Sequence, residues 1–220
     1  MDVHLMVREL TKSIVLFFAT LFPIVNPLGS AVIFLSLTRG YTADIRSVLV
    51  RRITFNSFIL LGVSIFIGSH VLQFFGVSIP VVQVAGGLVL SATGWTLLRQ
   101  KDTEPRPQSL NPDTIVQQVF YPLTLPITVG PGSISVAITL GADFSHQIHL
   151  WPVVFSLSAL LGPLLVAASV YLCYRSAEKL ERFLGVVGLS VFLRLSAFLV
   201  VCIGVQIMWN GISELIRQVS

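Results

Sequence analysis

Long apolar runs, about six in number, occupy most of the chain and limit what it can fold into. Each is roughly 20 residues or longer, the length that an α-helix needs to cross a hydrocarbon core of about 30 Å. Charged residues make up only 11% of the chain and the mean hydropathy is +0.87, so a water-soluble fold would lack polar surface. The sequence therefore predicts an all-α membrane protein with six transmembrane helices, at about residues 13–37, 52–75, 79–98, 114–141, 150–174 and 190–212.

A polar, proline-rich segment at residues 100–113 divides these runs into two groups of three. We therefore interpret the chain as a single membrane domain, with repeat one at about 1–99, a cytoplasmic linker at about 100–114 and repeat two at about 115–220. An odd number of spans in each half makes the second half enter from the opposite side. The sequence thus predicts two inverted 3+3 repeats.

Basic residues gather in alternate loops, whereas residues 75–80 and 141–149 contain no lysine or arginine. By the positive-inside rule, this places both termini outside the cytoplasm. The same distribution explains the net charge of +4 as a feature of topology, so we expect a lipid bilayer as partner and no nucleic acid. The basic loop residues are Arg39, Arg46, Arg51, Arg52, Arg99, Lys101, Arg106, Arg175, Lys179 and Arg182.

Two stretches in corresponding positions of the two halves interrupt their helices. They are residues 22–30 (FPIVNPLGS) and residues 122–133 (PLTLPITVGPGS). Proline removes a backbone donor, yet a helix in lipid must satisfy its own backbone groups. Asparagine favours the N-cap and proline the first helical position, so Asn26-Pro27 predicts the start of a new half-helix, and Gly130-Pro131 does the same. We therefore expect helices one and four to be broken.

The start of each half-helix presents unpaired N–H groups and the positive end of a helix dipole, which together favour a carboxylate. Inverted halves should bring these two ends together near the bilayer midplane. No aspartate or glutamate lies in the middle of a predicted span, which argues against a carboxylate proton relay and a cationic substrate. A small neutral solute with a carboxylate fits best. The predicted site residues are Asn26, Pro27, Gly29, Ser30, Thr128, Gly130, Pro131, Gly132 and Ser133, with Gln83 and Arg194 as secondary candidates.

Several alternatives remain open at this point. The breaks can be plain kinks whose freed groups neighbouring helices satisfy. Ser133 with a histidine would suggest an intramembrane hydrolase, although His146 and His149 lie beyond the outer end of span four. A non-transporting scaffold or regulator is a third reading. Arg194 can also extend to the interface as an ordinary interfacial residue.

Neither a metal nor another cofactor is expected. Cys173 and Cys202 lie in apolar surroundings without CxxC spacing or neighbouring histidines. This pattern predicts buried free thiols and argues against a disulfide or a metal site. Together with the poor placement of the histidines for acid–base chemistry, it leads us to expect that the protein is not an enzyme.

Short motifs recur along nearly the whole chain: residues 26–29 (NPLG) with 33–38 (IFLSLT), 75–79 (FGVSI) with 85–87 (AGG), 122–126 (PLTLP) with 130–132 (GPG), and 204–206 (GVQ) with 211–212 (GI). In combination they resemble the MarC family of bacterial inner-membrane proteins. The resemblance implies a multi-pass protein of the plasma (inner) membrane, with six helices and periplasmic termini.

A related archaeal member of the family is described as a transporter of small neutral amino acids. The resemblance therefore implies a secondary transporter of small neutral solutes such as glycine or alanine, with a proton or sodium as the coupling ion. Drug efflux, which the family name suggests, is less favoured. Where the family commonly has arginine before the Ala-Gly-Gly motif, this chain has Gln83, so binding or gating by that arginine would differ here. The oligomeric state is left open.

Overall fold

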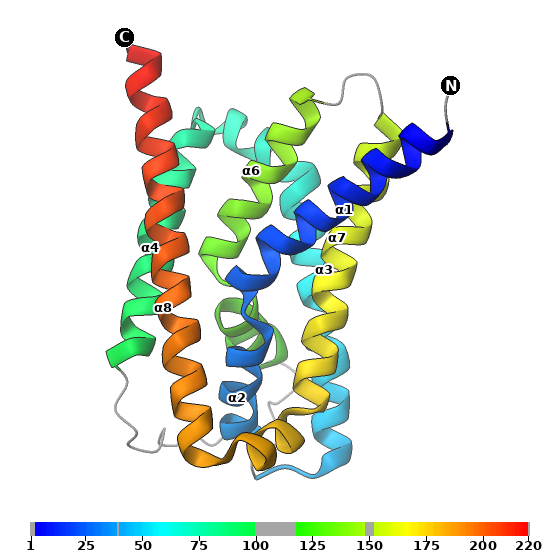
Figure 1. Cartoon of the computed structure of the whole chain (residues 1–220), viewed down its shortest axis with the longest axis vertical. Coiled ribbons are helices and arrows are strands. Elements are labelled where there is room, and N and C mark those ends of the chain that lie inside the picture. Colours follow the sequence, from blue (N-terminus) through cyan, green and yellow to red (C-terminus); the bar gives the residue numbers. More distant parts are fainter. Residues whose placement is uncertain (1–2, 39, 100–117, 148–151, 220) are drawn as a thin grey trace.

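The computed structural model describes residues 3–38, 40–99, 118–147 and 152–219, and the predicted linker at 100–114 lies outside these ranges. Within them every regular element is helical (Figure 1). Five helices are long and apolar enough to cross a membrane, and six spans result if one bent pair counts as a single span. The predicted all-α fold with membrane-length helices is therefore confirmed. The elements are α1 (Val3–Val25), α2 (Pro27–Thr38), α3 (Ala43–Phe74), α4 (Ile79–Arg99), η2 (Val119–Thr128), α6 (Pro131–Gln147), α7 (Pro152–Arg175) and α8 (Ala177–Val219).

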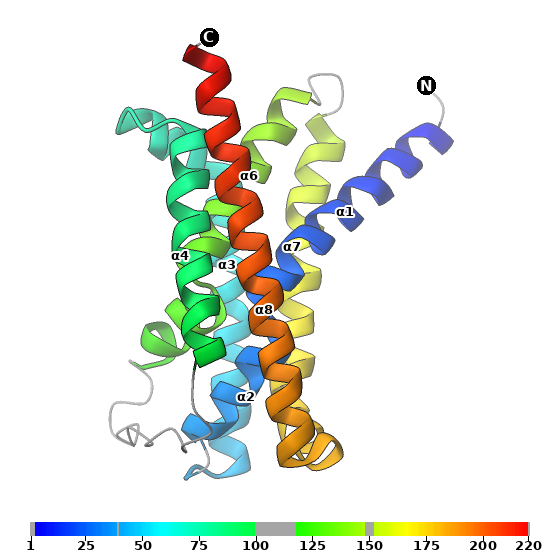
Figure 2. The same ribbon diagram turned by 60° about the vertical axis from the view of Figure 1, so that its left-hand side comes forward.

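The helices form an elongated bundle with the N- and C-termini at one end (Figures 1 and 2). α2 and α7 end at the opposite end, where α3 and α8 begin. α4 packs along α8, α1 packs against α7, and α3 contacts both α6 and α7. Of the two short elements, α2 packs against α7 and α8, and η2 packs against α3.

Glycines allow α4 and α8 to approach backbone to backbone. A Cβ atom added to Gly87 would lie 2.5 Å from the carbonyl oxygen of Gly204, and one added to Gly204 would lie 2.8 Å from that of Gly87. Seven residues further along each helix, Gly94 of α4 and Gly211 of α8 make similar backbone contacts with the other helix. In lipid, such close packing replaces the hydrophobic effect as a source of helix association.

The outer surface is as apolar as the interior. Phe17 and Leu21 are fully buried, whereas Phe55 and Trp209 are exposed over more than half of their surface. Many serine and threonine hydroxyls donate to carbonyls of their own helix, as Ser64 does to Leu60 at 2.7 Å. Both features suit a bundle surrounded by hydrocarbon.

Candidate functional site

The junction between α1 and α2 is formed by Asn26. Its φ of 47° is left-handed, a conformation that asparagine tolerates better than most residues. Its Oδ1 accepts a hydrogen bond from the N–H of Gly29 at 3.2 Å, and its carbonyl oxygen accepts from the Ser30 hydroxyl at 2.9 Å. Asn26 therefore caps the start of α2, which begins with Pro27.

The junction between η2 and α6 is more irregular. Tyr121 and Leu125 have extended backbones inside η2, because each precedes a proline that disfavours the helical conformation. The axes of η2 and α6 differ by 69°. Gly130 occupies the capping position before Pro131 and accepts from the N–H of Ile134 at 3.1 Å, but it has no side chain with which to cap the first turn.

The two junctions lie together inside the bundle. α2 and α6 both begin near mid-height and run in opposite directions, with α6 rising toward the end that holds both termini (Figures 1 and 2). α1 contacts α6, and α2 contacts η2. The starts of the two half-helices therefore border a common space.

This space is a cavity of about 470 Å³. Its walls contain residues of both junctions, of α4 and of α8. Pro27 and Gln83 do not line it; Gln83 instead packs against Gly211 of α8. The predicted residues that do line the cavity are Asn26, Gly29, Ser30, Thr128, Gly130, Pro131, Gly132, Ser133 and Arg194.

Further lining residues extend the cavity beyond the junctions. Ser36 lies near the end of α2, Thr93 and Leu97 near the end of α4, and Ser190 in the first half of α8. All three elements place these residues toward the end opposite the termini (Figure 1). The cavity therefore extends toward that end. Sequence reasoning missed these residues, although Ser36 follows Gly29 and Ile33 on one face of α2 at helical spacing.

Comparison with known proteins identifies the family. The chain matches the MarC family integral membrane protein family over residues 11–216. The chain belongs to the MarC family. Relatives from Salmonella typhimurium, Citrobacter koseri and Escherichia coli, each named UPF0056 inner membrane protein MarC, are 30% identical to it over 216 residues, which are 95% of this chain and 98% of theirs. No solved structure gives a significant match.

The family match confirms the resemblance to the MarC family that the sequence motifs indicated. It also agrees with the membrane-length helices. This MarC-family chain is a multi-pass inner-membrane protein. The names of the relatives state no activity. What the cavity does must therefore be argued from its own chemistry.

The cavity of this MarC-family protein is polar at the junctions, and its other walls mix apolar residues with Ser36, Thr93, Ser190 and Arg194. Ser30, Thr128 and Ser133 are buried, each at most 4% exposed. Among the described lining residues Arg194 alone is charged, and its side chain is exposed. The site thus offers hydroxyls, one amide, helix ends and a single guanidinium. This set suits hydrogen bonding to a small polar solute better than the binding of a cation.

Tyr174, near the end of α7, does not line the cavity of this MarC-family protein, but it contacts residues of both junctions, and sequence reasoning missed it. Its hydroxyl lies 2.7 Å from Oγ1 of Thr128, which itself donates to the carbonyl of Leu123 at 2.7 Å. The hydroxyl also interacts with Ser30 of α2, and the ring stacks on Phe34 with centroids 4.8 Å apart. Tyr174 therefore joins both junctions from behind the cavity. A tyrosine at the end of an apolar run is typical of an interfacial anchor, so its sequence position gave no signal.

Proposed function

We propose that this MarC-family protein is a secondary transporter of small neutral solutes such as glycine or alanine. The observation that carries the proposal is one cavity bordered by both helix junctions. At each junction the carbonyl end of one helix meets the N–H end of the next, so partial charges of both signs face the cavity. A zwitterionic amino acid presents the complementary pair of charges.

The carboxylate is best placed at the start of α6. Asn26 already satisfies the N–H of Gly29 in α2, whereas Gly130 has no side chain to do the same for α6. The first N–H groups of α6, at Gly132 and Ser133, therefore remain the better anion site. The Ser133 hydroxyl can add a hydrogen bond at the same position.

Cavity shape favours a small side chain. Gly132 packs so closely on α4 that an added Cβ would lie 2.9 Å from Leu90, and Gly29 is covered by the side chain of Asn26. The walls away from the junctions include apolar side chains such as Ile33 and Leu97. Such a site accommodates hydrogen or methyl as the side chain of the solute and disfavours a second charge.

Helix packing supports the proposal of two inverted 3+3 repeats with broken helices one and four. Exchange of the halves relates α1 and α2 to η2 and α6, α3 to α7, and α4 to α8. Under this exchange the contact of α2 with α7 corresponds to that of α6 with α3, and both contacts are present. Transport by rocking of one repeat against the other would use this arrangement. The arginine-rich end, to which the cavity extends, would then face the cytoplasm and the termini the periplasm.

A hydrolase is the competing proposal. The described residues that line the cavity include no histidine, cysteine, aspartate or glutamate. A general base must lie within hydrogen-bond reach of a nucleophilic serine. We therefore assign Ser133 to binding rather than to catalysis and propose that the protein is not an enzyme.

Uptake by liposomes that contain the purified protein tests the proposal. Labelled alanine should accumulate above protein-free liposomes under an imposed proton or sodium gradient. A double variant, Asn26→Ala with Ser133→Ala, should lose at least about 90% of this uptake because it removes groups at both junctions. Ser64→Ala is a matched control, since Ser64 is buried in α3 outside the cavity. Absence of uptake of any small amino acid under either gradient would refute the proposal, and full uptake by the double variant would refute the site.

A further inference from the structure

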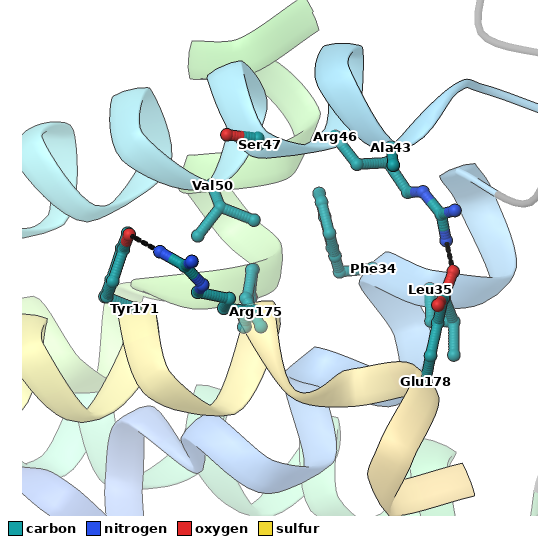
Figure 3. A pocket seen from close by; sticks show the side chains of 10 residues that line it. Phe34, Leu35, Ala43, Arg46, Ser47, Val50, Tyr171, Arg175 and Glu178 are labelled. Atoms are coloured by element: carbon teal, nitrogen blue, oxygen red, sulfur yellow. Dashed lines mark hydrogen bonds and ion pairs between the residues drawn. The ribbon is translucent and has the colours of Figure 1, made fainter. Parts of the chain in front are cut away.

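A second cavity, of about 230 Å³, lies at the end opposite the termini (Figure 3). It is bordered by the end of α2, the start of α3, the end of α7 and the start of α8. None of its lining residues belongs to the first cavity. Its chemistry also differs, because two arginines, Arg46 and Arg175, and one acid, Glu178, lie on its walls.

Each arginine is held in place by a partner on a helix of this corner. Nη1 of Arg46 pairs with the carboxylate of Glu178, and Nη1 of Arg175 donates to the Tyr171 hydroxyl at 2.6 Å (Figure 3). These pairs leave donors over, because a guanidinium carries five N–H groups. Nε of Arg46 is buried and has no hydrogen-bond partner. Because this nitrogen is closed off from the surroundings, a ligand in the cavity would bind the other N–H groups of the two arginines.

The charges on the walls favour an anion as ligand. Arg46 and Arg175 outnumber Glu178 on the walls, so the cavity keeps a net positive charge. Arg51 of α3 adds to this positive charge, because its guanidinium also interacts electrostatically with the Tyr171 hydroxyl. A guanidinium group suits the oxygens of a phosphate. In Figure 3 the side chains of Arg46 and Arg175 point to opposite sides of the cavity, with Phe34 between them, so each would bind a phosphate on its own.

An apolar stripe runs along α7 and ends at Arg175. Leu157, Leu160, Leu164, Ala168 and Tyr171 precede Arg175 at steps of three or four residues, so they share one face of the helix. The three leucines are 37%, 46% and 46% exposed. The stripe therefore faces the surroundings of the bundle, and it spans most of the membrane-crossing helix.

We propose that this corner binds an anionic phospholipid, with the phosphate at Arg175, where the stripe of α7 ends, and the acyl chains along that stripe. Basic pockets between transmembrane helices on a positively charged side are suited to anionic head groups. The apolar stripe distinguishes a lipid from free phosphate, which shares only the head-group chemistry. This site does not depend on the transport proposal.

Native mass spectrometry of the full-length protein in detergent tests the site. We expect saturable binding of phosphatidylglycerol, none of phosphatidylcholine at equal concentration, and no competition by millimolar inorganic phosphate. Arg175→Gln should weaken phosphatidylglycerol binding roughly fivefold, because one arginine near the lipid surface is lost. Arg99→Gln is the matched control: Arg99 is exposed and ends α4 at the same end, but it lies outside the cavity.

Leu164→Gln separates lipid from free anion, since it changes the stripe and leaves the cavity intact. It should weaken phosphatidylglycerol binding. The thermal unfolding midpoint of the lipid-free Leu164→Gln variant should equal that of the Arg99→Gln control. Equal binding of the two lipids, or unchanged binding by Arg175→Gln, would overturn the site. Displacement of the lipid by inorganic phosphate would overturn the lipid as its occupant.

Discussion

The hydroxyl of Tyr174 lies 2.7 Å from Oγ1 of Thr128, and both side chains are almost completely buried. Because the Thr128 hydroxyl donates to the carbonyl of Leu123, the Tyr174 hydroxyl is the donor between the two. This bond fastens the irregular end of η2 to the regular helix α7. The cavity wall at the second junction thus depends on a contact between residues 46 positions apart in the chain.

Loss of the Thr128 hydroxyl should destabilise the protein. Thr128→Val leaves the buried hydroxyl of Tyr174 and the carbonyl of Leu123 without this partner, at a cost of about 1–3 kcal/mol. Thr128→Ser keeps the hydroxyl and should lose less. Thermal unfolding in detergent measures both variants. A Val variant as stable as the Ser variant would show that the bond is not important for stability.

At Asn26, glycine should be tolerated better than alanine. Asn26→Ala loses the cap on Gly29 and places a Cβ atom at φ 47°, so we expect a loss of about 1–2 kcal/mol. Asn26→Gly also loses the cap but adopts this φ without strain. Its unfolding midpoint should therefore lie between those of wild type and Asn26→Ala. An alanine variant at least as stable as the glycine variant would contradict the left-handed junction.

The contact between α4 and α8 should not tolerate one additional methyl group. In Gly204→Ala, Cβ would lie 2.5 Å from Oγ of Ser91 and 2.7 Å from its backbone nitrogen. Overpacking of this kind costs about 1–3 kcal/mol. Gly62→Ala on α3 is the control, because no atom lies within 4 Å of an added Cβ and alanine favours the helix by about 1 kcal/mol. Equal melting behaviour of the two variants would argue against the close helix contact.

Cysteine labelling should show where the cavity opens. In a background without Cys173 and Cys202, Ser36→Cys and Thr93→Cys should react with a membrane-impermeant thiol reagent, because both positions line the cavity. They should react from the side opposite the termini. Ser57→Cys, at a fully buried position outside the cavity, should stay unlabelled. Labelling of Ser36→Cys only from the side of the termini would show that the cavity opens toward the termini, contrary to the proposal.

The sequence predicted the helices well because the apolar runs and the proline–glycine breaks are local signals. It predicted their ends less well. Span two was expected to start at about residue 52, whereas α3 begins at Ala43 behind the N-cap Thr42, since a charged helical turn continues beyond the apolar run. The start of span six agrees better: Gly185, with a non-helical backbone at φ 66°, divides α8, and its membrane-length part begins at Ser190, as expected.

Burial could not be predicted, because lipid and protein interior favour the same side chains. Cys202 was expected to be buried but is exposed, and Cys173 is only partly buried. The same ambiguity concealed the role of Tyr174. The composition of the site at the breaks was recognisable from local chemistry, whereas the lining from α4 and α8 depends on packing between segments far apart in the sequence.

Competition binding to the purified protein tests the central proposal most directly. Labelled alanine should bind saturably and be displaced by unlabelled glycine or alanine. Alaninamide should not displace it, because it lacks the carboxylate that the first turn of α6 is proposed to hold near Gly132 and Ser133. Displacement by alaninamide as effective as by alanine, or the absence of saturable binding of any small amino acid, would contradict the proposed site.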